Sequence, residues 1–122
     1  MQFNKDNPIY LQIKEVIYNA ILTEEFKNGE RIPSIRDMAM SLEVNPNTAT
    51  RAYGLLQDEG IIDNQRGIGY FTKEDAIDLV KNKKKEEFLQ HDVPLFFQTM
   101  DKLNLSIESV ISIYDAINDK KE

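Results

Sequence analysis

The stretch SIRDMAMSLEVNPNTATRAYGLLQDEG, residues 34–60, has the pattern of two short helices joined by a brief turn. Ser34 and Asp37 match the S-x-x-D capping box, and Asn45-Pro46 is a second helix start, with an acceptor side chain before a proline. After each start, apolar residues recur at the i, i+3, i+4 and i+7 positions of one helix face: Ile35, Met38, Ala39 and Leu42, then Ala49, Ala52, Tyr53 and Leu56. Gly60 stands where a left-handed residue ends a helix. These features predict a helix-turn-helix.

Another helix is expected before this stretch. Asn7-Pro8 predicts its start, with the Asn7 side chain as the cap, and the apolar periodicity predicts that it runs to about Glu25. Its apolar face consists of Ile9, Ile13, Val16, Ile17, Ala20 and Ile21. A loop with Gly29 as its turn residue then leads to Ser34.

Directly after Gly60 the pattern becomes strand-like. Ile61–Asn64 and Gly69–Thr72 are short strand candidates that flank Gln65–Ile68. A two-stranded hairpin directly after a helix-turn-helix is a wing. Residues 1–73 are therefore predicted to form a winged helix-turn-helix domain.

Residues 74–122 are expected to form a helical segment in three pieces. The first runs from about Glu74 to Gln90, the second begins near Asp92, where Pro94 forbids an unbroken regular helix, and the third begins at Ser106. So short a segment cannot bury its many large apolar side chains by itself, and packing against a second copy is the economical solution. We therefore expect a protein that is mainly α-helical with a small β-hairpin, and that dimerises through residues 74–122.

The composition excludes several classes of protein. The 122 residues include no cysteine and one histidine, His91, which excludes disulfides, thiolate metal sites, a cysteine nucleophile and an imidazole cluster. No apolar run approaches the roughly 18 residues of a membrane span, and the N-terminus has no signal-peptide pattern. Nucleophile elbows, metalloprotease motifs and phosphate loops are also missing from the sequence. We expect a cytoplasmic protein that is not an enzyme, with no catalytic residue, cofactor, metal or membrane partner.

The formal net charge of −6 argues against nucleic acid as a partner, but the acids are unevenly placed. None falls between Asn45 and Gln57. With the apolar positions assigned to the core, this second helix leaves four polar residues near its outer face: Asn47, Thr48, Thr50 and Arg51. Asn, Arg and Thr can all read base edges in the major groove. The alternative is a polar capping turn with a solvated arginine.

Two further arginines suit phosphate contacts. Arg36 lies in the first turn of its helix, next to Ser34, where a helix N-terminus favours anions, although an ion pair with Asp37 is the alternative. Arg66 precedes Gly67 at the expected wing tip and could reach the DNA backbone or minor groove. A hairpin turn alone would account for the glycines of the wing but not for Arg66.

The chain resembles the DNA-binding domain of the GntR family of bacterial transcriptional regulators. The matching stretches are PIYLQIKEVIYNAIL at 8–22, NGERIPSIRDMAMSLEV at 28–44, NPNTATRAYGLLQDEGII at 45–62 and QRGIGYF at 65–71. The form VNPNT-x-x-RAY and the short C-terminal segment look like the YtrA-type subfamily. The chain departs from many members in placing Thr50 where they have arginine, with its own Arg51 one position later.

The resemblance implies a set of DNA contacts, which by position are Arg36, Asn47, Thr48, Thr50, Arg51, Arg66 and Gly67. Ser34 and Asn45, at the two helix starts, complete the residues expected at the DNA. The function implied is a repressor that binds an inverted-repeat operator in double-stranded DNA as a homodimer. A winged-helix module that binds protein and not DNA is the alternative. The operator, the regulated genes and any small-molecule effector stay open.

Overall fold

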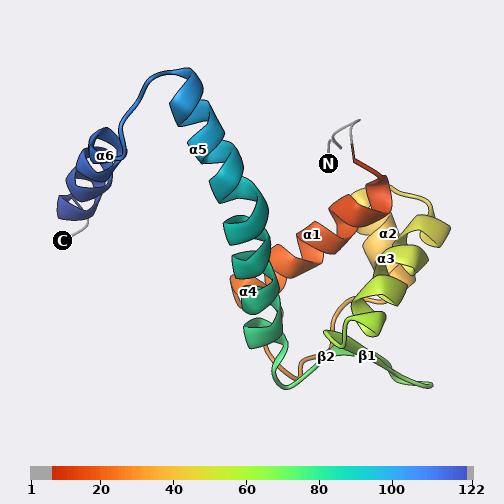
Figure 1. The fold of residues 1–122 in the computed structure, drawn as a ribbon. Helices are drawn as coiled ribbons and strands as arrows, with labels where there is room; N and C mark the ends of the chain where they lie inside the picture. Colours follow the sequence, from red (N-terminus) through yellow and green to blue (C-terminus); the bar gives the residue numbers. More distant parts are fainter. Residues whose placement is uncertain (1–6, 121–122) are drawn as a thin grey trace. The chain divides into compact units, whose positions relative to one another are not determined.

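The computed structural model describes residues 7–120, which form six α-helices, one π-helical turn and one β-hairpin (Figure 1). The elements are α1 (Ile9–Leu22), α2 (Ile35–Leu42), α3 (Pro46–Asp58), β1 (Ile62–Gln65), β2 (Gly69–Thr72), α4 (Ala76–Glu87), η1 (Phe88–Asp92), α5 (Val93–Lys102) and α6 (Ile107–Asp119). They fall into two compact units, the first ending at Lys83 and the second beginning at Lys84. The expected class, mainly helical with one small hairpin, is confirmed.

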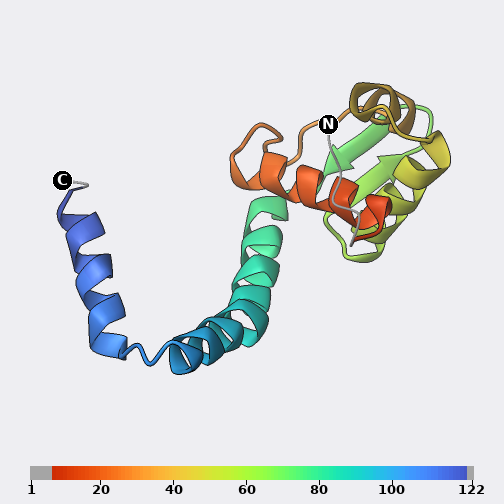
Figure 2. The same cartoon turned by 90° about the horizontal axis from the view of Figure 1, so that it is seen from above.

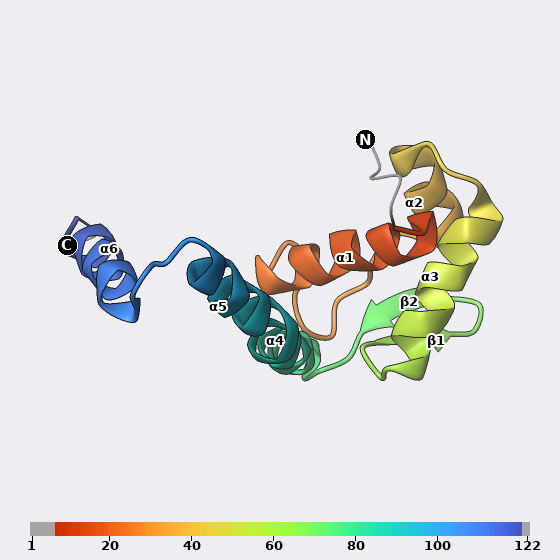
Figure 3. The ribbon, with the colours of Figure 1, turned by 45° about the horizontal axis from the view of Figure 1, so that its top comes forward.

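The core of the first unit lies between α1, α2, α3 and the hairpin, and α1 packs across α3 (Figure 3). Its large fully buried side chains are Ile13, Ile17, Tyr18, Ile21, Tyr53, Leu56, Ile61, Ile62 and Val80. Tyr18 and Val80 lie outside the apolar faces that the sequence predicted. On the predicted α1 face, Val16 is half-buried and the Ile9 side chain is 44% exposed. Burying this much apolar surface is the main force that holds the three helices together.

Helix caps follow the predicted positions at α2 and α3. The Ser34 hydroxyl accepts a hydrogen bond from the Asp37 backbone N–H at 3.0 Å, and the Asn45 side chain accepts one from the Asn47 N–H at 2.8 Å. Each cap satisfies a backbone donor that the first turn of a helix cannot pair. Between the two helices, Glu43 adopts a left-handed conformation with φ 57°, which turns the chain within three residues.

The predicted start of α1 is wrong by one residue. Pro8 is the N-cap, with an extended backbone and no side-chain cap, so the Asn7 side chain does not cap the helix. The Gln12 side-chain amide instead donates to the Asn7 carbonyl at 2.8 Å. At the other end α1 stops at Leu22, before the expected Glu25, since Glu24 takes a left-handed conformation with φ 61°.

The hairpin pairs β1 with β2 in antiparallel register, from Ile62 opposite Thr72 to Gln65 opposite Gly69 (Figure 2). Gly67 at its tip has φ 75°, a conformation that favours glycine. The Thr72 hydroxyl fastens the base of the hairpin to the preceding loop, because it donates to the Lys27 carbonyl at 2.6 Å and accepts from the Glu30 N–H at 3.0 Å.

The first compact unit extends beyond residue 73, where the boundary was expected. Ala76 and Val80 of α4 are fully buried in the same core as α1 and α3. The beginning of α4 therefore packs as part of the winged unit, and the unit ends at Lys83.

The second unit consists of the end of α4, the π-helical turn η1, α5 and α6. Pro94 lies at the start of α5 and cannot donate a backbone hydrogen bond, and the wider turn η1 stands just before it. Ser106 caps α6, as expected, by accepting from the Ser109 N–H. Of residues 84–120, Met100 alone is buried.

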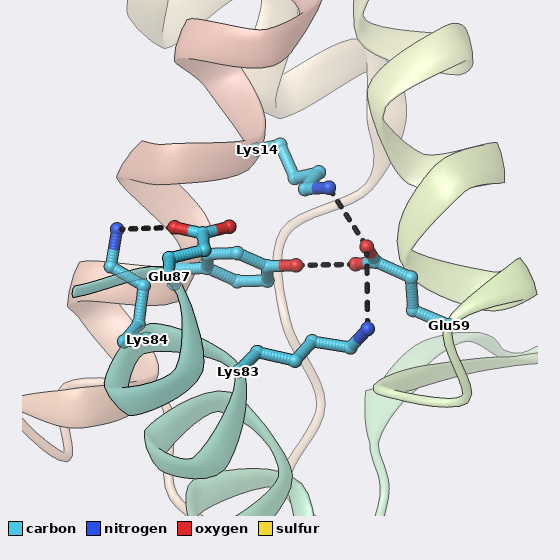
Figure 4. Close-up of polar contacts among 6 residues, drawn as sticks. Lys14, Glu59, Lys83, Lys84 and Glu87 are labelled. Atoms are coloured by element: carbon cyan, nitrogen blue, oxygen red, sulfur yellow. Dashed lines mark hydrogen bonds and ion pairs between the residues drawn. The ribbon is translucent and has the colours of Figure 1, made fainter. Parts of the chain in front are cut away.

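Glu59, the C-cap residue of α3, ties three helices together (Figure 4). Its carboxylate lies 2.8 Å from the Lys14 ammonium of α1 and 3.8 Å from that of Lys83 in α4, and it accepts a hydrogen bond from the Tyr18 hydroxyl. Burial alone would raise the pKa of Glu59, but the hydrogen bonds from Lys14 and Tyr18 and the two lysine charges outweigh it. The pKa is therefore lowered.

A lowered pKa in the folded state means that the ionised Glu59 stabilises the fold above the unfolded-state pKa. This contribution is lost as the pH falls through the lowered pKa. We expect Glu59→Gln to reduce the free energy of unfolding by about 1 kcal/mol at pH 7, after allowance for solvent screening, and to cost less below pH 4. Urea unfolding of the wild type and the variant at pH 7 and below pH 4 measures these changes in the free energy of unfolding.

The matched control for Glu59→Gln is Glu87→Gln, which removes the exposed carboxylate of the Lys84–Glu87 pair at 3.7 Å. Exposed pairs contribute little, so the control should change stability by less than about 0.5 kcal/mol. Equal losses in the two variants, or a Glu59→Gln loss that is independent of pH, would contradict the assigned role.

Gly54 and Gly60 make a second matched pair. A Cβ added at either glycine would meet no atom within 4 Å, but Gly54 lies inside α3, whereas Gly60 has φ 76°. We expect Gly54→Ala to stabilise the protein by about 0.5–1 kcal/mol because glycine weakens a helix interior. Gly60→Ala should destabilise it by about 1–2 kcal/mol because alanine resists the left-handed conformation. Urea denaturation measures both, and changes of the same sign would refute the explanation.

Candidate nucleic-acid interface

The outer face of α3 is the centre of the candidate interface. Ala49, Ala52, Tyr53 and Leu56 point into the core and are fully buried. The opposite side of the helix carries Asn47, Thr50 and Arg51, which are exposed, with half-buried Thr48 at its flank. The four α3 residues that the sequence predicts at the DNA thus share one accessible helix surface.

Tyr53 fixes the orientation of that surface. Its hydroxyl donates a 2.6 Å hydrogen bond to the Pro33 carbonyl, just before α2, and its ring meets the Tyr70 ring of β2 edge-on, with centroids 4.9 Å apart. Burial raises the pKa of the Tyr53 hydroxyl far above its usual value, so the group stays a neutral donor. One side chain therefore joins α3 to the start of α2 and to the hairpin.

Three polar side chains of the set are already engaged within their own helices. The oxygens of Ser34 and Asn45 accept the capping bonds, and the Thr50 hydroxyl donates to the Pro46 carbonyl at 2.9 Å. Toward DNA, the Ser34 hydroxyl proton and the Asn45 amide N–H groups remain as donors, which suits phosphate oxygens. The Thr50 oxygen remains an acceptor.

Arg36 occupies the first turn of α2 and is exposed. The ion pairs found among residues 7–120 do not include one between Arg36 and Asp37, the alternative that the sequence left open. The positive end of α2 and the guanidinium together make this a suitable place for a phosphate.

The wing presents Arg66 and Gly67 at an exposed tip, followed by Ile68, whose side chain is 55% exposed. In Figures 1 and 3 this tip and the turn before α3 lie at the same end of the first unit. A single DNA duplex could therefore meet both elements.

Arg31 is a candidate that sequence reasoning missed. Its backbone bridges to Phe71, and its side chain lies over the hairpin, because a Cβ added to Gly69 would come within 2.9 Å of the Arg31 Nε. Gly69, with φ 147°, thus leaves room for an exposed guanidinium beside the tip end of β2. The only signal in the sequence was the polar Arg31 directly before the apolar Ile32. In the structure Ile32 is buried and Arg31 is exposed, which is the alternation of side chains typical of a strand.

Tyr10 of α1 was also missed. The Arg51 guanidinium carbon lies 3.7 Å from the centroid of the Tyr10 ring, so the two side chains stack. Because Tyr10 is on a different helix, far from Arg51 in the sequence, the apolar pattern of α1 could not have shown this contact.

The α3 part of the candidate interface is free of acids even though the chain is acidic. No Asp or Glu occurs from Asn45 to Gln57, and Asp63 in β1 is paired with Lys73 at 3.9 Å. Carboxylates facing a duplex would repel its phosphates. The exposed surface of α3 can therefore meet a polyanion.

Other site types find no support in the part of the chain that the structure describes. Residues 7–120 contain no group of three metal-ligating side chains and no helix long and apolar enough to cross a membrane. His91 is exposed in η1.

Comparisons with known proteins identify the family of the chain. The model of the family "Bacterial regulatory proteins, gntR family" matches residues 9–71. The chain is 37% identical to the uncharacterised HTH-type transcriptional regulator YhcF of Bacillus subtilis, over 90% of this chain and 89% of that protein. It is 41% identical to the transcriptional repressor YtrA of the same organism, over 57% of this chain and 53% of YtrA.

A solved structure extends the similarity to both units. A GntR family transcriptional regulator from Listeria monocytogenes aligns with a TM-score of 0.79 and 33% identity, covering 93% of this chain and 98% of that one. The winged helix-turn-helix and the helical segment that follows it thus occur together in a relative. The chain belongs to the GntR family of bacterial transcriptional regulators and carries that family's DNA-binding helix-turn-helix domain.

Proposed function

We propose that the protein is a transcriptional repressor that binds an inverted-repeat operator as a homodimer. The observation that carries this proposal is the acid-free exposed face of α3, with Asn47, Thr50 and Arg51, on a helix whose other side is locked into the core. The N-terminal residues of a recognition helix contact base edges in the major groove. A repressor role is supported by the similarity to YtrA, which is a named repressor.

In this proposal Arg51 and Asn47 read bases, and Thr48 and Thr50 lie beside them. Arg can bind guanine bidentately and Asn can bind adenine. Arg36, Ser34 and Asn45 contact phosphates from the two helix starts, and Arg66 and Gly67 contact the backbone or minor groove from the wing. A cytoplasmic location, where bacterial DNA lies, accompanies this function.

The second unit supports the homodimer. Its exposed large apolar side chains are Phe88, Leu89, Leu95, Phe96, Phe97, Leu103, Leu105, Ile107, Ile111, Ile113, Tyr114 and Ile117. So large an apolar surface is rare on a monomeric protein and marks an association surface. Two copies joined there would present two winged units to two half-sites, roughly one helical turn apart or as the dimer geometry dictates.

The direct test is selection of bound duplexes from random DNA with the full chain, followed by affinity measurement at 50 mM and 200 mM salt. We expect an inverted repeat and an affinity that falls with salt, because phosphate contacts release counterions. Non-specific binding should be weak, since the net charge is −6. No enrichment, or an absence of salt-dependent binding to any duplex, would refute the proposal and favour a protein-binding winged helix.

Arg51→Ala and Arg36→Ala should weaken operator binding in different ways. If Arg51 reads a base, its loss costs about 1–3 kcal/mol and relaxes the preference at one base pair. Loss of a phosphate contact at Arg36 should weaken all sequences alike and reduce the salt slope by about 1. Lys102→Ala in α5, distant in sequence from the winged unit, is the control. Binding of both arginine variants like the wild type would refute the assignments.

The homodimer is tested by light scattering of the full chain. At micromolar concentration we expect twice the 14.1 kDa mass of one chain. Ile111→Glu in α6 should weaken association at least about tenfold, because it removes an apolar contact from the interface. Asp115→Asn, a polar change on the same helix, should leave the mass unchanged. A monomeric wild-type protein at micromolar concentration would contradict the proposed dimer.

A further inference from the structure

Arg51 does not project freely from α3, because its guanidinium stacks on the ring of Tyr10 from another helix. The guanidinium carbon is 3.7 Å from the ring centroid, a contact typical of cation–π stacking. None of the ion pairs among residues 7–120 involves Arg51. The position of this cation is therefore set by an aromatic ring rather than by a carboxylate.

Stacking on the face of a ring leaves the edge of the guanidinium unused. The N–H donors of arginine lie in the guanidinium plane and point outward from its edge. They can still form the paired hydrogen bonds that arginine makes with guanine, while a carboxylate partner would occupy the same donors.

The Tyr10 ring, on which the Arg51 guanidinium stacks, is itself held in place by packing. Tyr10 is half-buried and packs against the core cluster of the first unit, and α1 packs directly against α3. Arginine loses rotamer entropy when it binds, and a fixed platform removes part of that loss in advance.

From these contacts we propose that Tyr10 is a positioning residue for DNA recognition, holding the Arg51 guanidinium at the exposed face of α3 with its N–H edge turned toward the operator. This inference rests on the proposed function, in which Arg51 reads a base. It adds a residue of α1, outside the helix-turn-helix and the wing, to the determinants of affinity and sequence preference.

The test uses the full chain and the duplex that the wild type selects from random DNA, together with single-base variants of that duplex. Tyr10→Leu keeps an apolar side chain against the core but removes the aromatic face, and Tyr10→Phe keeps the face. We expect Tyr10→Leu to bind about threefold to tenfold more weakly, with the lost discrimination at the base pair affected by Arg51→Ala. Tyr10→Phe should bind within about twofold of the wild type.

A double-mutant cycle isolates the pair. In an Arg51→Ala background, Tyr10→Leu should change affinity by less than about twofold, because the group that Tyr10 positions is gone. Ile9→Ala, an exposed apolar truncation on the same end of α1, is the control for non-specific damage to the helix and should bind like the wild type. The Arg51 Nε–H resonance of the free protein should shift in Tyr10→Leu and stay in Tyr10→Phe.

The outcomes separate this inference from the proposed function. A wild type that selects no duplex overturns both. If the wild type binds and Tyr10→Leu binds equally well, or more tightly because Arg51 has been released, the positioning role is wrong and the proposed function stands. An equal loss with and without Arg51 would also overturn it, by showing that Tyr10 acts through the fold alone.

Discussion

The DNA-binding unit depends on the buried side chain of Tyr53. Its ring fills the space between α3 and β2, and its hydroxyl satisfies the Pro33 carbonyl at the entry to α2. Because burial raises the pKa of this phenol, it stays protonated and keeps its donor. A buried acceptor without that donor would be costly, so α3 has one favoured rotation about its axis. Its polar face is thereby directed outward.

The parts of the fold that depend on neighbouring residues could be predicted from the sequence. The caps at Ser34 and Asn45 and the left-handed Gly60 follow from chemistry within a few residues, and the apolar faces follow from helical spacing. The Asn7 cap failed because the signal was equally consistent with Pro8 as the N-cap. The boundary near residue 73 came from the change from the strand pattern of the hairpin to a helical pattern, and this local pattern does not show that Val80 packs in the core of the preceding unit.

The features that shape the candidate site beyond α3 itself could not be predicted, because each joins residues far apart in the chain. Glu59 binds Lys14 across 45 positions, and the side chain of Arg31 reaches the backbone at Gly69. In the sequence, nothing distinguishes Tyr10 from the other residues beside the apolar face of the first helix. Only the packing of α1 against α3 reveals that it meets Arg51. Such contacts leave no periodic pattern.

The acidity of the chain explains why this packing matters for recognition. A protein with net charge −6 gains little from bulk electrostatic attraction to DNA, so its few interface cations must each contribute through geometry. A carboxylate partner would hold an arginine in place at the expense of its charge and its donors. An aromatic ring holds the guanidinium and leaves both available. Contact with Tyr10 therefore orders the Arg51 side chain before DNA binds. The guanidinium also keeps its full positive charge, which attracts the DNA phosphates.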